Sequence, residues 1–219
     1  IRGELSLSAE VSLAYNVADD TARVLGTGLD RDYSTVTDDE WPMTLDLAGV
    51  APEHVVTGDY KTGHGAVTRA ERNWQIKGGA LAMARAFDRD RADSQLIYLR
   101  AGRPPWRDRA TFDALALAGI AGELREVRET VAQARAAEDA GSWFRPGECC
   151  TYCPAVERCP AVARAAQMLV PVTERMGAVT RENFGRLWLA AVPVRKALDA
   201  VDAAARALAA EGDVPLGAG

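Results

Sequence analysis

Residues 43–63 read MTLDLAGVAPEHVVTGDYKTG, and this stretch contains two short apolar runs with one aspartate in each. Residues 43–48 read as a strand, residues 49–53 carry turn-forming types, and residues 55–60 read as a second strand. The glycine-rich segment 61–65 then leaves the second strand. We therefore expect residues 43–60 to form two neighbouring strands that are mostly apolar, each with one aspartate.

The pattern on either side of this pair predicts a mixed fold. The upstream runs 11–15 and 21–25 are separated by polar residues and indicate a hairpin. Downstream, the spacing predicts helices at 69–87, 112–140, 161–169 and 182–210, the last interrupted near Pro193, and a strand at 95–100. The order of strands, helix, strand and helices predicts an α/β or α+β class, in which helices flank a mixed central sheet.

Composition places the chain among ordinary globular proteins, since 48% of its residues are hydrophobic and 26% are charged. No apolar run approaches the roughly 20 residues that cross a bilayer, and no secretory signal opens the chain. We expect no membrane partner, and the clustered cysteines described below lead us to expect a cytoplasmic protein. The net charge of −5 argues weakly against a nucleic-acid partner, because the distribution of charge decides where a polyanion can bind.

The two aspartates of this stretch and one lysine suggest chemistry. Asp46 lies in an apolar run, where a carboxylate is costly without a partner or a metal. Asp59 and Lys61 are two positions apart on a strand and so project to the same face. If the strands pair, two carboxylates and the carbonyl of Tyr60 form an oxygen-rich site suited to Mg²⁺ or Mn²⁺, beside an ammonium that can orient water. The alternative is an ordinary Asp–Lys surface pair.

These residues resemble the PD-(D/E)XK nuclease superfamily in its RecB-like branch, which includes CRISPR-adaptation nucleases and phage exonucleases. The resemblance covers roughly residues 10 to 160 and is most specific at Gly58-Asp59-Tyr60-Lys61-Thr62-Gly63. It implies a restriction-endonuclease-like core and a metal-dependent DNA nuclease, more an exonuclease than an endonuclease, acting in recombination, repair, or phage or CRISPR-related processing. It also implies a recombination or helicase protein as a partner, and it fits a ring-forming enzyme and a monomer alike.

The resemblance assigns further site residues. Gln75 matches the glutamine on the helix behind the site, and Glu10 matches an upstream acidic metal ligand. The family usually has a tyrosine four residues after the glutamine, whereas this chain has Gly79. The intact Asp46, Asp59 and Lys61 favour an enzyme, and Gly79 and the acidic balance favour the rival, a catalytically inactive DNA-binding or assembly module.

Three basic side chains near these residues are candidates for binding DNA. His64 follows Lys61 in the glycine-rich loop, and Arg100 and Arg103 follow the strand at 95–100. Their alternative reading is as solvated polar or charged side chains at strand ends.

All four cysteines, Cys149, Cys150, Cys153 and Cys159, lie in one short segment, which points to a metal site in a reducing compartment and not to disulfides. The spacing resembles the C-terminal cysteines of iron–sulfur members of the same branch and implies a [4Fe–4S] cluster. Because the sequence begins with Ile1 and no cysteine precedes Cys149, the fourth ligand is either in a preceding segment or Cys149 itself. The other readings are zinc, a vestigial site and four buried thiols.

The expected organisation follows from these assignments. Residues 1–110 form the nuclease core sheet with the glutamine helix, and residues 111–170 complete the same domain with a helix and the cysteines. Residues 171–219 form a C-terminal helical extension.

Overall fold

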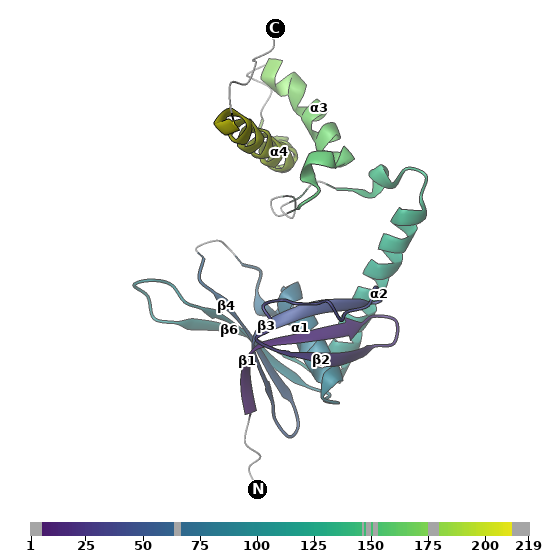
Figure 1. Ribbon diagram of the computed structural model, residues 1–219, viewed down its shortest axis with the longest axis vertical. Coiled ribbons are helices and arrows are strands. Elements are labelled where there is room, and N and C mark those ends of the chain that lie inside the picture. The colour runs from purple at the N-terminus through teal and green to yellow at the C-terminus, as the bar shows by residue number, and fades with distance from the viewer. Residues whose placement is uncertain are drawn as a thin grey trace. The chain divides into compact units, whose positions relative to one another are not determined.

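The computed structural model describes residues 6–63, 67–145, 147, 150, 153–174 and 180–211. It has an α+β fold with a six-stranded mixed sheet and several helices, as the sequence predicts (Figure 1). The chain divides into two compact units, residues 1–131 and residues 132–219, and each is described by itself.

The sheet of the first unit has the strand order β2-β1-β3-β4-β5-β6. All neighbouring strands are antiparallel except β4 and β5, which are parallel. The predicted hairpin at residues 11–25 and the predicted strand pair at 43–60 are confirmed. The strands are β1 (Ser6–Asn16), β2 (Thr21–Thr27), β3 (Glu40–Val50), β4 (Val55–Lys61), β5 (Ala92–Tyr98) and β6 (Trp106–Phe112).

Strand β6 is absent from the sequence-based expectation. Its side chains alternate along the strand, with Arg107 and Arg109 exposed and Phe112 buried. The inward-facing series includes Asp108, whose carboxylate accepts the N–H of Ala70 at 3.0 Å. Asp108 interrupts the alternation of apolar and polar residues by which a strand is recognised in a sequence.

Two helices pack on the sheet and close the hydrophobic core. The predicted helix at 69–87 begins with a 3-10 turn, η1 (Ala70–Arg72), and continues as α1 (Trp74–Ala86). The predicted helix at 112–140 is α2 (Ala114–Ala136). The core they share with the sheet includes Leu13, Tyr15, Leu45, Leu81, Leu96 and Leu117, all at most 4% exposed.

A buried tyrosine and an ion pair fix the C-terminal end of α1 to the β1–β2 turn. The Tyr15 hydroxyl donates to Asp20 at 2.9 Å, and Arg85 donates two hydrogen bonds to the same carboxylate. Burial, with the Asp20 carboxylate adding to it, raises the pKa of Tyr15 above its ordinary value. The helix is therefore held at one end while its N-terminus faces β4.

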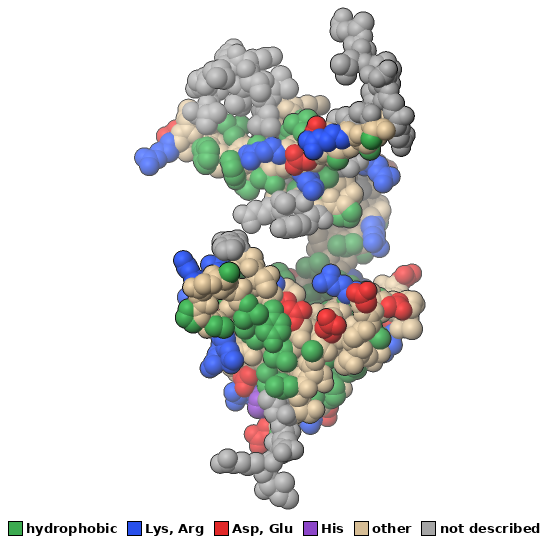
Figure 2. Space-filling view, turned by 60° about the vertical axis from the view of Figure 1, so that its left-hand side comes forward, with side chains coloured by type: hydrophobic (Ala, Val, Ile, Leu, Met, Phe, Trp, Pro, Cys, Tyr) green, Lys and Arg blue, Asp and Glu red, His purple; other side chains and the backbone are tan. Residues whose placement is uncertain are grey.

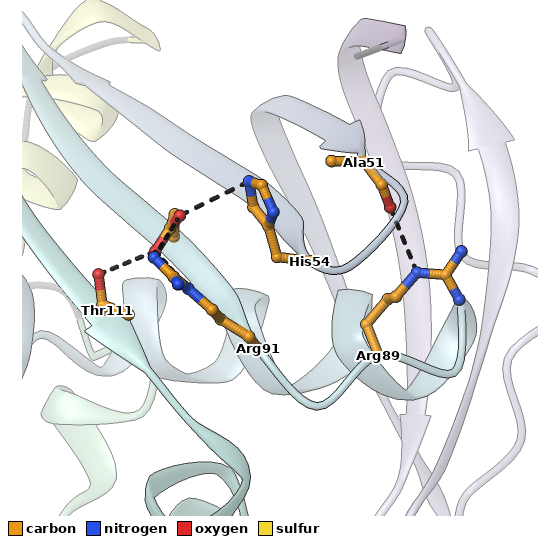
Figure 3. Close-up of polar contacts among 6 residues, drawn as sticks. Ala51, His54, Arg89, Arg91 and Thr111 are labelled. Atoms are coloured by element: carbon orange, nitrogen blue, oxygen red, sulfur yellow. Dashed lines mark hydrogen bonds and ion pairs between the residues drawn. The ribbon is translucent and has the colours of Figure 1, made fainter. Parts of the chain in front are cut away.

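The starting ends of β4 and β5 carry a polar cluster of their own. Figure 3 shows His54, Arg91 and Thr111 pointing toward one carboxylate, which belongs to Asp93. The Thr111 hydroxyl donates to Asp93 at 2.8 Å, and His54 Nε2 lies 3.5 Å from it. Each charge in the cluster has a partner, so we interpret it as a structural tie between β4, β5 and β6.

The second unit is helical. It contains η2 (Ala140–Trp143), η4 (Val156–Arg158), α3 (Pro160–Glu174) and α4 (Phe184–Glu211), with α3 packed on α4. The expected interruption near Pro193 is wrong, because α4 continues through this residue, whose side chain is fully buried. Within the described ranges, no helix has the length and apolar character to cross a membrane.

Candidate functional site

Asp46 and Asp59 lie at the end of the pairing between β3 and β4. The last backbone pair before them joins Leu47 to Gly58, and continuing this register places Asp46 opposite Asp59. The strands do not pair at that position. Instead, a carboxylate oxygen of Asp46 accepts the backbone N–H of Tyr60 at 2.7 Å. The Asp46 side chain therefore binds the N–H group of β4 just after the last backbone pair.

Asp59, Lys61 and Gln75 form a closed triangle. Lys61 Nζ lies 2.6 Å from Asp59 Oδ2 and donates to Gln75 Oε1 at 2.8 Å, and Gln75 Nε2 donates to Asp59 Oδ1. Asp59 and Lys61 come from one face of β4, and Gln75 comes from the first turn of α1. The structure thus brings together three residues that span sixteen positions in sequence.

Asn73 positions the glutamine and is not among the site residues expected from the sequence. As the N-cap of α1, its side-chain oxygen accepts the N–H groups of Gln75 and Ile76, at 3.0 and 3.2 Å. Capping fixes where α1 begins and therefore where Gln75 projects. Asparagine directly before an apolar helical run is the sequence signal that identifies such a residue.

The environment of Asp59 suits a cation. The residue is 4% exposed, and its buried Oδ2 contacts Lys61 without an aligned hydrogen bond from any residue that the structure describes. Burial raises the pKa of Asp59 above its usual value, the Lys61 ammonium lowers it, and the Asp46 carboxylate raises it again. A divalent cation between the two carboxylates would offset both the burial and the repulsion, so the donor set fits Mg²⁺ or Mn²⁺.

Glu10 lies on the other side of Asp46. The β1–β3 register pairs Ala9 with Leu47 and Val11 with Leu45, which places Glu10 opposite Asp46. Glu10 is exposed, has a positive φ of 50° and accepts the N–H of Gly28 through its carbonyl oxygen at 3.0 Å. Glu10, Asp46 and the residues from Gly28 to Arg31 line a cavity of about 510 Å³. Glu10 therefore shares a cavity with Asp46.

The described side chains do not provide a complete set of metal ligands at Asp46 and Asp59. Within the described ranges, no group of three or more His, Cys, Asp or Glu side chains is close enough to hold one ion. A cation at Asp46 and Asp59 would therefore need water, substrate or backbone oxygens as further ligands, which is common for Mg²⁺. The Tyr60 side chain is 43% exposed at this end of the sheet.

The basic residues proposed to bind DNA lie near the same end of the sheet. Arg100 and Arg103 are in the turn after β5, where Arg103 is exposed and Arg100 half-buried. The backbone N–H of Leu99 donates to the carbonyl oxygen of Lys61, so this turn begins beside the triangle. His64 lies outside the described residues.

Gly79 is explained by packing. It is buried on α1, and a Cβ atom at this position would lie 2.5 Å from Cδ2 of Leu45 on β3. A larger side chain at this position does not fit while Leu45 stays in place, and this includes the tyrosine expected from the nuclease resemblance.

The described cysteines lie in the second unit. Cys150, Cys153 and Cys159 are free and partly buried, whereas Cys149 lies outside the described residues. The N–H of Cys153 donates to the carbonyl of Cys150, and Cys159 directly precedes α3. These three thiols are not grouped as metal ligands in the part of the chain that the structure describes, so the [4Fe–4S] cluster and zinc stay predictions.

Fold and site together define an α+β protein with a carboxylate–lysine–glutamine site at one end of a mixed sheet. A family model matches residues 30–217, and the chain belongs to that family, which is described as "Protein of unknown function (DUF2800)". No curated protein and no solved structure matches the chain.

Proposed function

We propose that the chain is a Mg²⁺- or Mn²⁺-dependent deoxyribonuclease of the PD-(D/E)XK type that digests DNA from an end. The triangle of Asp59, Lys61 and Gln75 is the observation that carries the proposal. An ordinary surface Asp–Lys pair does not place its carboxylate at 4% exposure with a second carboxylate beside it. Burying such groups is costly, which favours a chemical role for them.

Each residue has a distinct task in this proposal. Asp46 and Asp59 would hold the cation, which when bound would polarise the scissile phosphate and lower the pKa of a water molecule. The Lys61 ammonium donates to Gln75 and forms an ion pair with Asp59, and its charge would orient water or offset charge on the phosphate. Gln75 holds the carboxylate and the ammonium in fixed positions through its two amide atoms.

One rival function has structural support. A catalytically inactive DNA-binding or assembly module on the same fold is favoured by the absence of a third ligand-type side chain at Asp46 and Asp59 among the described residues. Gly79 also favours it, because the packing against Leu45 leaves out the family's tyrosine. The two functions differ in turnover and not in DNA binding.

Digestion of end-labelled DNA separates the two functions. Linear and circular DNA are incubated with the parent protein and with Lys61→Ala, in Mg²⁺ or Mn²⁺ and in EDTA. We expect the parent with metal to degrade linear DNA and to leave circular DNA intact, and the variant to degrade neither. DNA binding without cleavage by the parent would contradict the nuclease and support the rival module.

A further inference from the structure

The edge of the sheet next to the triangle carries a stacked aromatic pair. Tyr98 on β5 and Trp106 on β6 are register partners, and their rings lie parallel, with centroids 3.9 Å apart and planes 1° apart. Tyr98 is 4% exposed, whereas Trp106 is 48% exposed. Among the residues that the structure describes, β6 is the last strand of the sheet, so no described strand lies beyond the indole. Tyr98 thus supports one face of a tryptophan that is about half exposed.

The strand register connects this pair to Lys61. Lys61 pairs with Tyr98 across β4 and β5, and Tyr98 pairs with Trp106 across β5 and β6. Paired residues project to the same face of a sheet, so the three side chains form one row across three strands. Two strand spacings amount to about 10 Å. A nucleic-acid strand with one base on Trp106 could therefore place a nearby phosphate at Lys61.

Basic side chains accompany the row. Arg103 is exposed in the β5–β6 connection, and the Arg100 guanidinium lies 5.8 Å from the Tyr98 ring. The Nε atom of Arg100 is buried and has no hydrogen-bond partner among the residues that the structure describes. Because that atom is buried, the donors open to a phosphate oxygen are the terminal N–H groups of this half-buried guanidinium.

Figure 2 brings this side of the sheet-bearing unit forward, in the lower part of the view. Hydrophobic side chains gather there with Lys and Arg beside them, while most Asp and Glu side chains in this view lie to the right and a few lie below the patch. The net charge of the whole chain is −5, so the basic side chains beside this patch do not simply follow from the composition of the chain. Aromatic surface next to arginine suits a ligand with both flat rings and phosphates.

We propose that Tyr98 and Trp106 form a stacking platform for an unpaired base of single-stranded DNA, and that Arg100 binds a phosphate of the same strand. Bases within a duplex are stacked on their neighbours and do not present a ring face to a protein, whereas unpaired bases do. The inference rests on the proposed function only for what happens at Lys61, since binding at the platform needs no cleavage.

Fluorescence anisotropy with a labelled single-stranded oligonucleotide in EDTA tests the platform without turnover. We expect Trp106→Ala to weaken binding about ten-fold, the loss of one base–aromatic stack, and Trp106→Phe to keep most of the affinity. Trp188→Ala is the matched control, because Trp188 is 49% exposed on α4 and its loss should change nothing. Arg100→Gln should weaken binding and reduce the slope of log affinity against log salt by about one.

Several results would overturn the inference. They are no binding of the single strand by the parent, equal binding by the parent and Trp106→Ala, an equal loss in Trp188→Ala, and an equal effect of Trp106→Ala on a blunt duplex. An RNA of the same sequence that binds as tightly as the DNA would contradict the assignment to DNA.

Its failure is distinguishable from that of the nuclease. If the protein binds single-stranded DNA through Trp106 but never cleaves DNA, the nuclease proposal is wrong and the platform proposal stands. If the protein cleaves DNA and Trp106→Ala binds as tightly as the parent, the platform proposal is wrong and the nuclease proposal stands.

Discussion

The carboxylate of Asp46 accepts the backbone N–H of Tyr60 at 2.7 Å, just where the pairing between β3 and β4 ends. A side chain therefore replaces a backbone carbonyl as the acceptor for β4, and this contact holds the carboxylate near Asp59. An amide side chain could make the same hydrogen bond without the charge, which separates the structural role of Asp46 from its proposed role as a metal ligand.

Asp46→Asn should keep the fold and lose the response to metal. Without a divalent cation the melting temperature should stay the same or rise, because the variant removes repulsion from Asp59. A parent that binds Mn²⁺ gains about 2.7 kcal/mol at a hundred times its Kd, and the variant should gain far less. Thermal unfolding with and without Mn²⁺ measures both effects.

The control for this experiment is Asp93→Asn, at the opposite end of β5. It should lower the melting temperature, since Asp93 accepts from Arg91 and Thr111, and should leave the Mn²⁺ response unchanged. A full Mn²⁺ response in Asp46→Asn would rule out Asp46 as a ligand.

Gln75→Ala should slow cleavage about 10- to 100-fold, as loss of a group that supports metal ligands typically does. The variant keeps the ion pair between Asp59 and Lys61 and loses the two contacts of the glutamine. The hydrogen bond that Asp59 loses is worth about 1–3 kcal/mol. Single-turnover cleavage and thermal unfolding measure the two losses. Gln133→Ala, at an exposed glutamine of α2, is the control and should cleave at the parent rate. Parent-like cleavage by Gln75→Ala would remove the glutamine from the site.

Two adjacent glycines of α1 should respond oppositely to alanine. A Cβ at Gly78 meets its nearest atom, Met43 Cε, at 4.0 Å, so Gly78→Ala should stabilise the protein by about 1 kcal/mol through helix propensity. A Cβ at Gly79 meets Leu45 Cδ2 at 2.5 Å in the core, so Gly79→Ala should destabilise by about 1–3 kcal/mol despite the same gain. Urea unfolding measures both, and combining Gly79→Ala with Leu45→Ala should show favourable coupling between the two substitutions. Stabilisation by Gly79→Ala alone would show that the helix does not pack as described.

Glu40 should contribute to stability in a defined range of pH. Arg23 donates two hydrogen bonds to Glu40, and the Thr37 N–H donates a third. These contacts lower the pKa of Glu40 from 4.5 to about 2, and the hydrogen bonds from Arg23 have the largest effect. A carboxyl group with a lowered pKa in the folded state stabilises the protein above its ordinary pKa, and this contribution is lost as the pH falls toward the lowered value.

Thermal unfolding across this range tests the contact. Between pH 4.5 and pH 2, the melting temperature of the parent should fall more steeply than that of Glu40→Gln. Glu71→Gln, at an exposed residue of η1, should follow the parent. The same slope in Glu40→Gln and the parent would argue against the contact.

The sequence predicted most of the sheet because β3, β4 and β5 are apolar runs bounded by turn residues. It missed β6, where Asp108 stands among the inward-facing residues and bonds Ala70. The predicted interruption at Pro193 was also wrong. Proline usually disfavours a helix interior, but this proline is buried within the continuous helix α4.

The candidate site was predictable in composition and not in geometry. The period of a strand placed Asp59 and Lys61 on one face, and the resemblance supplied Gln75. The cap at Asn73 follows a local signal that was overlooked, whereas the hydrogen bond from Tyr60 to Asp46 depends on where β3 and β4 stop pairing and the contact between Gly79 and Leu45 depends on how α1 packs against the sheet. No local pattern specifies the last two.

Single-turnover cleavage of end-labelled linear DNA with Mn²⁺ tests the nuclease most directly, with Lys61→Ala compared against Lys77→Ala. Lys77 also pairs with a carboxylate, that of Glu123, and lies on α1 two positions beyond Gln75, but it takes no part in the triangle. We predict that the parent and Lys77→Ala cleave at similar rates and that Lys61→Ala is slower by about a hundredfold or more. Equal rates for the parent and Lys61→Ala, or no cleavage by either, would contradict the account.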